Sequence, residues 1–72
     1  MDLRKLLGRN VRRFRCEKHW TQEEFAEITG LSQQSISELE NGRSNPTLLT
    51  LHALAQGLGV KVVDLLDENP KR

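Results

Sequence analysis

Hydrogen-bonding side chains recur at helical spacing near the middle of the chain. On a helix over residues 33–41, the outward-facing side chains would be Gln33, Gln34, Ser37 and Glu38. A glutamine amide can pair bidentately with N6 and N7 of adenine, a glutamate can accept a hydrogen bond from N4 of cytosine, and serine is permissive. These residue types favour the reading of base edges, and the alternative is that two exposed glutamines serve solubility alone.

Helix caps predict how this segment is positioned. Thr21 and Glu24 fit a capping box, which starts a first helix over residues 22–29. Gly30 suits a left-handed helix end, because glycine has no Cβ to clash there. Ser32 is a good N-cap for the second helix.

The small residue Ala26 allows the two helices to cross closely, at about 90–120°. Ala26, Gly30 and the buried branched residue Ile36 have the spacing of a DNA-binding helix-turn-helix. An ordinary helical hairpin that merely packs is the alternative.

Apolar side chains recur at helical spacing through the rest of the chain as well. The sequence therefore predicts an all-α bundle of five helices, over residues 2–18, 22–29, 33–41, 48–58 and 60–67. Leu48 is expected in the core stripe of the fourth helix, and Val62, Leu65 and Leu66 are expected to point inward from the fifth. We expect one domain over residues 1–67 and a flexible tail over 68–72, which contains Pro70.

The formal net charge of +1 hides an uneven distribution. Residues 1–20 carry seven Lys or Arg and two acidic side chains, whereas residues 21–42 carry five Glu and no Lys or Arg. The segment that would read bases therefore needs basic side chains from elsewhere to bind phosphates. Arg9, Arg12 and Arg13 are the candidates, although a basic run is often only a solvated helix face.

The sequence offers no catalytic or metal-binding constellation. It contains no nucleophile–base pair, no phosphate-binding loop and no residues at metal-ligand spacing, so we expect no enzyme, no cofactor, no metal and no small-molecule ligand. The single cysteine, Cys16, excludes an internal disulfide framework and suits a reducing cytoplasm. No apolar run reaches the ~18–20 residues of a membrane span and no signal peptide is evident, so a cytoplasmic, nucleoid-associated bacterial or phage protein is expected.

Between about Leu7 and Leu66 the sequence resembles the phage-repressor and Cro-like (XRE) helix-turn-helix family. The matching segments are VRRFRCEKHWTQEEFAEITGLSQQSISELENG, NPTLLTLHALAQGLGV and VVDLL. The resemblance implies a five-helix bundle of the lambda-repressor-like type and sequence-specific binding of double-stranded DNA, usually as a two-fold homodimer. It further implies a transcriptional regulator whose third helix lies in the major groove of a pseudo-palindromic operator.

Several family roles carry over to matching positions. Arg15 and Glu40 match a buried or half-buried ion pair that joins the first helix to the end of the third. Gln22 matches a residue that holds a DNA phosphate through its side chain and its backbone N–H. Asn41 and Arg43 match loop positions that contact the DNA backbone.

The sequence departs from the family pattern at four positions. His19 stands where the family usually has glycine, and Lys61 stands where a Ser, Thr or Asp N-cap is usual. Leu49 and Val63 are apolar where the family is usually polar. We predict that these two, with Leu66 sharing the contact, form a dimer interface, and the alternative is that they are lone surface apolar residues.

Two function classes stay open. The first is the DNA-binding regulator, as a phage repressor, a restriction–modification controller or an antitoxin regulator. The second is a protein-interaction or antitoxin-type module that uses the same fold to bind a protein such as a toxin or a polymerase subunit.

Overall fold

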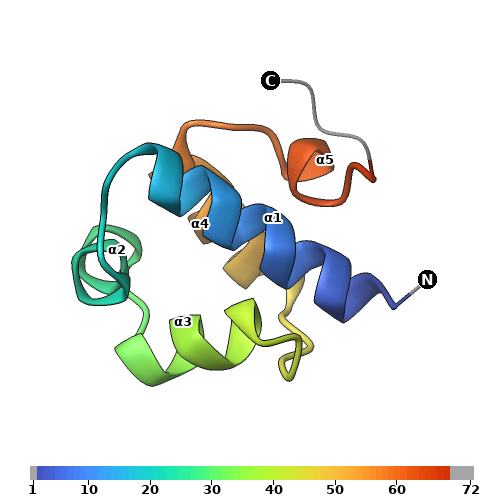
Figure 1. The fold of residues 1–72 in the computed structure, drawn as a ribbon, viewed down its shortest axis with the longest axis horizontal. Coiled ribbons are helices and arrows are strands. Elements are labelled where there is room, and N and C mark those ends of the chain that lie inside the picture. The colour runs from blue at the N-terminus through green and yellow to red at the C-terminus, as the bar shows by residue number, and fades with distance from the viewer. Residues whose placement is uncertain (1, 69–72) are drawn as a thin grey trace.

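Five helices follow one another in the computed structural model, which describes residues 2–68 (Figure 1). They are α1 (Leu3–Glu17), α2 (Gln22–Thr29), α3 (Gln33–Glu40), α4 (Leu48–Leu58) and α5 (Val62–Leu65). No strand occurs within residues 2–68, and the predicted all-α fold is confirmed. Helix α1 runs through the middle of the view in Figure 1, with α2 and α3 on one side and α5 on the other. Residues 69–72 of the predicted tail lie outside the described part of the chain.

None of the helices within residues 2–68 is long and apolar enough to cross a membrane.

The capping box at the start of α2 forms as predicted. Thr21 Oγ1 accepts a hydrogen bond from the backbone N–H of Glu24 at 3.0 Å, and Glu24 Oε1 accepts one from the N–H of Thr21 at 2.8 Å. Gly30 ends α2 with φ at 79°, and its N–H donates to the carbonyl of Ala26 at 2.9 Å. The direction in which α3 leaves α2 is therefore set by local hydrogen bonds.

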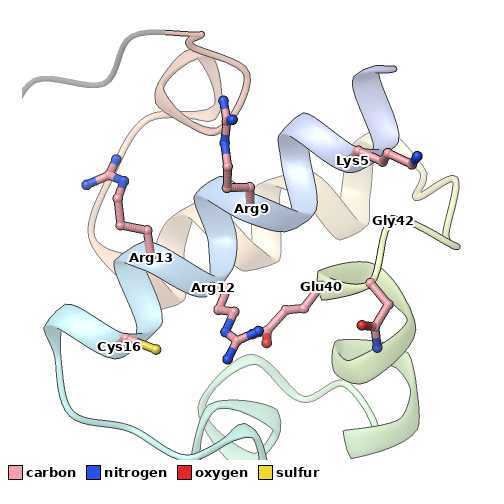
Figure 2. Close-up of a pocket in the computed structure, with 8 residues that line it drawn as sticks. Lys5, Arg9, Arg12, Arg13, Cys16, Glu40 and Gly42 are labelled. Atoms are coloured by element: carbon pink, nitrogen blue, oxygen red, sulfur yellow. The ribbon is translucent and has the colours of Figure 1, made fainter. Parts of the chain in front are cut away.

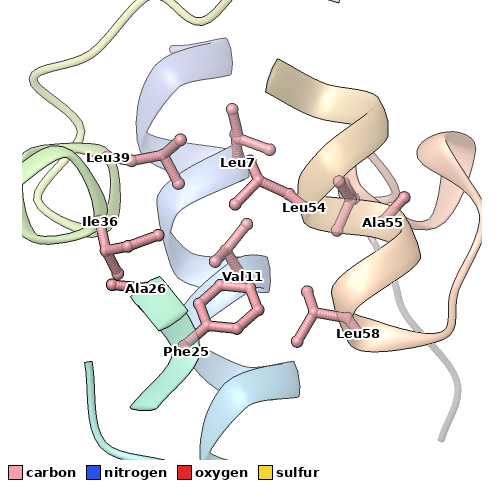
Figure 3. Close-up of a cluster of buried hydrophobic side chains, with 10 residues drawn as sticks. Leu7, Val11, Phe25, Ala26, Ile36, Leu39, Leu54, Ala55 and Leu58 are labelled. Atoms are coloured by element: carbon pink, nitrogen blue, oxygen red, sulfur yellow. The ribbon is translucent and has the colours of Figure 1, made fainter. Parts of the chain in front are cut away.

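The hydrophobic core lies where α1, α4 and the α2–α3 pair meet, and α5 adds one buried leucine (Figure 3). Its buried members are Leu7, Val11, Phe25, Ala26, Ile36, Leu39, Leu54, Ala55, Leu58 and Leu65. Trp20 stacks on Phe25 with the ring centroids 6.0 Å apart and so covers the start of α2. The same core thus holds both helices of the helix-turn-helix.

A buried amide joins α1 to α5. Asn10, 1% exposed, donates from Nδ2 to the carbonyl oxygens of Leu65 at 2.8 Å and Asp67 at 2.9 Å. These carbonyls lie at the end of α5, where the helix leaves such groups without internal partners. The sequence analysis did not single out Asn10.

His19, which stands where the family usually has glycine, is left-handed, with φ at 61°. Lys18 ends α1, and the N–H of His19 then donates to the carbonyl of Cys16 at 3.0 Å. A side chain in this region of backbone space is uncommon, because its Cβ crowds the carbonyl.

The predicted bounds of the fifth helix are wrong. It was expected over residues 60–67 and covers only Val62–Leu65. Gly59 is left-handed, and the N–H of Val60 turns back to the carbonyl of Ala55 at 3.0 Å, which keeps residue 60 outside the helix. The third helix, predicted to residue 41, ends at Glu40.

Two leucines are less buried than predicted. Leu48 is 81% exposed rather than part of the core, because it occupies the first position of α4, ahead of the buried Leu54, Ala55 and Leu58. Leu66, expected to point inward, is 37% exposed and stands at the C-cap of α5.

Helices α1 and α3 approach each other closely at Gly8. A Cβ on Gly8 would collide with the carbonyl oxygen of Leu39 and lie 2.8 Å from that of Glu40. Both neighbours are backbone atoms, so no side-chain rotation could relieve the overlap. Glycine at position 8 therefore allows α1 to support the last turn of α3.

We expect Gly8→Ala to lower the free energy of unfolding by about 1–3 kcal/mol, the usual cost of overpacking a core. This loss should appear although alanine favours a helix over glycine by about 1 kcal/mol. Chemical denaturation would measure it, with Cys16→Ala on the exposed side of α1 as a control expected within about 0.5 kcal/mol of the wild type. Equal or higher stability of Gly8→Ala would show that the two helices are not in contact there.

Candidate nucleic-acid interface

Helix α3 presents one polar face and buries the other. Ile36 and Leu39 are buried, whereas Gln33, Gln34 and Glu38 are exposed. Gln34 Nε2 and Glu38 Oε2 lie 3.4 Å apart, one helical turn from each other. Exposed side chains with donors and acceptors thus line the outer surface of this helix.

Ser37, the fourth predicted base-reading residue, is half-buried at the margin of that face. Its carbonyl accepts a hydrogen bond from Asn41 Nδ2 at 2.8 Å. Ser37 is therefore less exposed than Gln33, Gln34 and Glu38.

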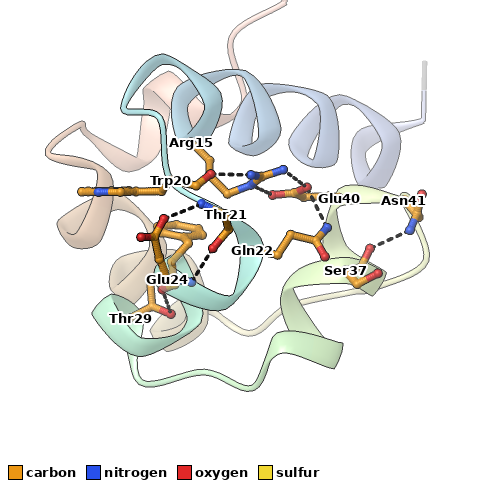
Figure 4. Close-up of polar contacts among 10 residues, drawn as sticks. Arg15, Trp20, Thr21, Gln22, Glu24, Thr29, Ser37, Glu40 and Asn41 are labelled. Atoms are coloured by element: carbon orange, nitrogen blue, oxygen red, sulfur yellow. Dashed lines mark hydrogen bonds and ion pairs between the residues drawn. The ribbon is translucent and has the colours of Figure 1, made fainter.

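An ion pair connects α1 to the end of α3 (Figure 4). Arg15 donates from Nε to Glu40 Oε2 at 2.7 Å and from Nη2 to Oε1 at 3.0 Å. The side chains are only 11% and 4% exposed, and the hydrogen bonds to Glu40 raise the pKa of Arg15. Arg15 Nη1 also donates to the carbonyl of Trp20 at 2.6 Å, so the guanidinium fixes the chain just before α2.

Gln22 joins this network from the first position of α2. Its Nε2 donates to Glu40 Oε1 at 3.1 Å, which uses one of two amide hydrogens. The second amide hydrogen remains available, and the first N–H groups of a helix have no intrahelical acceptor. The half-buried Gln22 can therefore hold an anion with its side chain and backbone while it stays bonded to Glu40.

The turn after α3 exposes Asn41 and Arg43. Gly42 between them is left-handed, with φ at 74°, and the N–H of Arg43 donates to the carbonyl of Glu38 at 2.9 Å. This geometry holds the backbone of the turn close to α3. Asn41 and Arg43, the two side chains predicted to contact the DNA backbone, thus lie at the C-terminal end of the polar face.

The three predicted arginines of α1 point in different directions (Figure 2). Arg12 points toward Glu40 and α3, whereas Arg9 and Arg13 point away from α3, although all three line the same groove between α1 and the end of α3. Arg13 pairs with Glu17 at 2.8 Å, and its guanidinium lies 4.3 Å from the centroid of the Phe14 ring. The structure therefore directs Arg12 toward the end of α3 and pairs Arg13 with Glu17.

The residues predicted for a dimer contact are exposed and apolar. Leu49 is 81% exposed, Val63 66% and Leu66 37%. Leu48 and Leu3 are exposed as well, which the sequence analysis did not anticipate. Leu3 and Leu66 both line a shallow groove together with Pro46 and Leu51, so apolar side chains of α1, α4 and α5 adjoin one another.

Residues 11–65 match the family model described as Helix-turn-helix, HTH_3. The chain belongs to the helix-turn-helix family. The resemblance to XRE-type regulators is thereby confirmed, and the chain is a transcriptional regulator with the helix-turn-helix DNA-binding fold.

Curated relatives and solved structures agree with this assignment. The chain is 55% identical to the uncharacterized HTH-type transcriptional regulator y4dJ of Sinorhizobium fredii, over 97% of this chain and 95% of that protein. It is 41% identical to the control protein C.SmaI of Serratia marcescens, over 92% of this chain and 79% of that one. The crystal structure of the hypothetical transcription factor NHTF from Neisseria is similar, with a TM-score of 0.88 and 41% identity over 92% of this chain and 76% of that one.

We expect Arg15→Met to lower the free energy of unfolding by about 3–5 kcal/mol, because it leaves the buried Glu40 carboxylate without its cation. The double variant Arg15→Met/Glu40→Met should lose less than the two single variants together, with a coupling of about 0.5–3 kcal/mol in a double-mutant cycle. The exposed pair Arg13–Glu17 provides the control cycle, for which a coupling below about 1 kcal/mol is expected. Additive losses at Arg15 and Glu40 would rule out a stabilising interaction between them.

Proposed function

We propose that this chain is a sequence-specific regulator that binds double-stranded DNA as a homodimer, with α3 in the major groove of a pseudo-palindromic operator. The observation that carries the proposal is the exposed row of Gln33, Gln34 and Glu38 on a helix whose opposite face is fixed in the core. A recognition helix needs this arrangement, because its side chains must reach base edges while its axis stays in place.

The side chains of α3 define the kind of half-site. Gln33 and Gln34 lie at the N-terminal end of the helix, which is the end that contacts bases in helix-turn-helix proteins. Their amides suit adenine, and Glu38 suits cytosine, with Ser37 adjusting a neighbouring position. Helix α3 has no Lys or Arg, so the most common contact to guanine is absent from it.

Phosphate contacts come from the edges of this face. Gln22 is bonded to Glu40, the last residue of α3, and Asn41 and Arg43 follow Glu40 in the chain, so the three lie near the C-terminal end of α3 and can hold the DNA backbone there. Arg9 and Arg12 add charge from α1. Arg13 would first have to leave Glu17, so it ranks behind them.

Gln33→Ala and Gln34→Ala should each cost about 1–3 kcal/mol of binding energy at one base position and relax the preference there, because a bidentate pair is lost. The measurement is selection of bound sites from a random DNA library, followed by titration against single-base variants of the selected site. Gln56→Ala, which removes an exposed glutamine from α4, is the matched control and should leave the preference unchanged. A loss spread evenly over all sequences would contradict the base-reading role.

Dimerisation is expected on energetic grounds. A single module buries only about 600–1,000 Å² of protein surface on DNA, which gives modest affinity, whereas a dimer places two recognition helices about 34–36 Å apart. Leu49, Val63 and Leu66 supply an apolar surface for the contact, and the exposed Leu48 enlarges it. A charge in such a surface would remain unpaired when two copies meet.

Leu49→Glu should therefore convert a dimer into a monomer in sedimentation at tens of micromolar, while the helical signal in circular dichroism stays unchanged. Ser35→Glu adds the same charge on exposed α3 and should leave the sedimentation coefficient at the dimer value. A wild-type monomer that is unaffected by Leu49→Glu would remove the dimer from the proposal and favour a different protein as the partner of this surface.

A further inference from the structure

A groove of about 480 Å³ separates α1 from the turn that follows α3 (Figure 2). It is lined from α1 by Lys5, Arg9, Arg12, Arg13 and Cys16, and from the other side by Glu40, Asn41 and Gly42. The groove thus begins at Asn41, at the C-terminal end of the recognition helix, and continues along α1.

Lys5 and Arg12 lie seven residues apart, which places them on one face of α1, about 10.5 Å from each other along its axis. Lys5 lies against the turn, because a Cβ on Gly42 would be 2.9 Å from Lys5 Cγ. Arg12 points toward Glu40 (Figure 2). Within residues 2–68 neither side chain has an ion-pair partner.

The nearby carboxylate does not neutralise these cations. Glu40 already accepts hydrogen bonds from Arg15 at 2.7 and 3.0 Å and from Gln22 at 3.1 Å. Arg9 adds a further positive charge between Lys5 and Arg12 in the sequence, and like charges one helical turn apart destabilise a helix. The groove therefore has a charge that an anionic partner would compensate.

We propose that Lys5 and Arg12 bind the sugar–phosphate backbone of DNA next to the phosphate held by Asn41, and so extend the contact beyond the bases read by α3. The inference rests on the proposed function and adds to it a second set of contacts with DNA phosphates, in which Lys5 takes part. A linear polyanion with repeated charges can meet both cations at once, which a single phosphate cannot do at this separation.

These contacts carry no sequence information, since they reach only phosphates. Their signature is the dependence of affinity on salt, because each phosphate contact contributes about 0.9 to the slope of log K against log salt concentration. In a two-fold dimer every substitution removes two contacts. Lys5→Gln or Arg12→Gln should therefore lower the slope by about 1.8 and leave the preferred bases unchanged.

The test compares the wild type, Lys5→Gln, Arg12→Gln and the control Lys61→Gln, whose exposed side chain stands at the start of α5. Each is titrated against the selected operator in two duplexes. One duplex ends at the outer edges of the half-sites, and the other carries additional base pairs on both sides. We expect the lower slope for Lys5→Gln and Arg12→Gln on the longer duplex and wild-type slopes for Lys61→Gln. Hydroxyl-radical footprinting should show that the two groove variants lose protection of the backbone beside the half-site while protection within it persists.

Wild-type slopes and footprints for both groove variants would overturn the inference, and an acidic protein would then be the better partner for the groove. Failure of the proposed function looks different, because the wild type itself would not prefer the selected operator over a shuffled duplex. Circular dichroism of each variant verifies folding, which exposed substitutions should preserve.

Discussion

The contact between Arg15 and Glu40 determines how the helix-turn-helix is held. One guanidinium reaches the last residue of α3 and the carbonyl of Trp20 before α2, while Gln22 from the start of α2 bonds to the same carboxylate. The end of α1, the start of α2 and the distant end of α3 are therefore fixed at a single charged site. Because both charges are almost out of water, each depends on the other, and the arrangement of α1, α2 and α3 is set as a unit.

Close packing between the backbones of α1 and α3 adds a second constraint at Gly8, seven residues before Arg15 on α1. Gly8 allows α1 to touch the carbonyls of Leu39 and Glu40, so the end of α3 is held by contact as well as by charge. The basic residues of α1 are consequently carried at a fixed position beside an acidic pair of helices. The near-neutral net charge of the chain results from this division between its segments and does not describe the surface that would face DNA.

The parts of the fold that depend on local chemistry could be predicted from the sequence. The capping box of Thr21 and Glu24 and the left-handed Gly30 are specified by a few neighbouring residues. The spacing of Ala26 and Ile36 predicted the helix-turn-helix because this motif, too, is specified by residues close together in the sequence.

Features that depend on distant segments could not be predicted from local patterns, and the Arg15–Glu40 ion pair was anticipated only because the family resemblance implied it. The burial of Asn10 requires the end of α5 to lie against α1, and the need for glycine at position 8 requires the crossing with α3. The exposure of Leu48 depends on which turn of α4 first reaches the core. Of the candidate site, residue types indicated the face of α3 and its edges, but only the structure showed that Arg12 and Arg13 point in different directions.

The two faces of α3 separate what folds the protein from what it would recognise. Ile36 and Leu39 are buried, with Glu40 bonded to α1, whereas Gln33 and Gln34 contribute nothing to the core. Residues on the outer face can therefore be substituted without weakening the hydrophobic core. Copies of this gene could thus acquire new target sites by a few point mutations. The same architecture makes the domain suitable for engineering, since a foreign recognition face could be grafted onto α3 while its buried residues are kept.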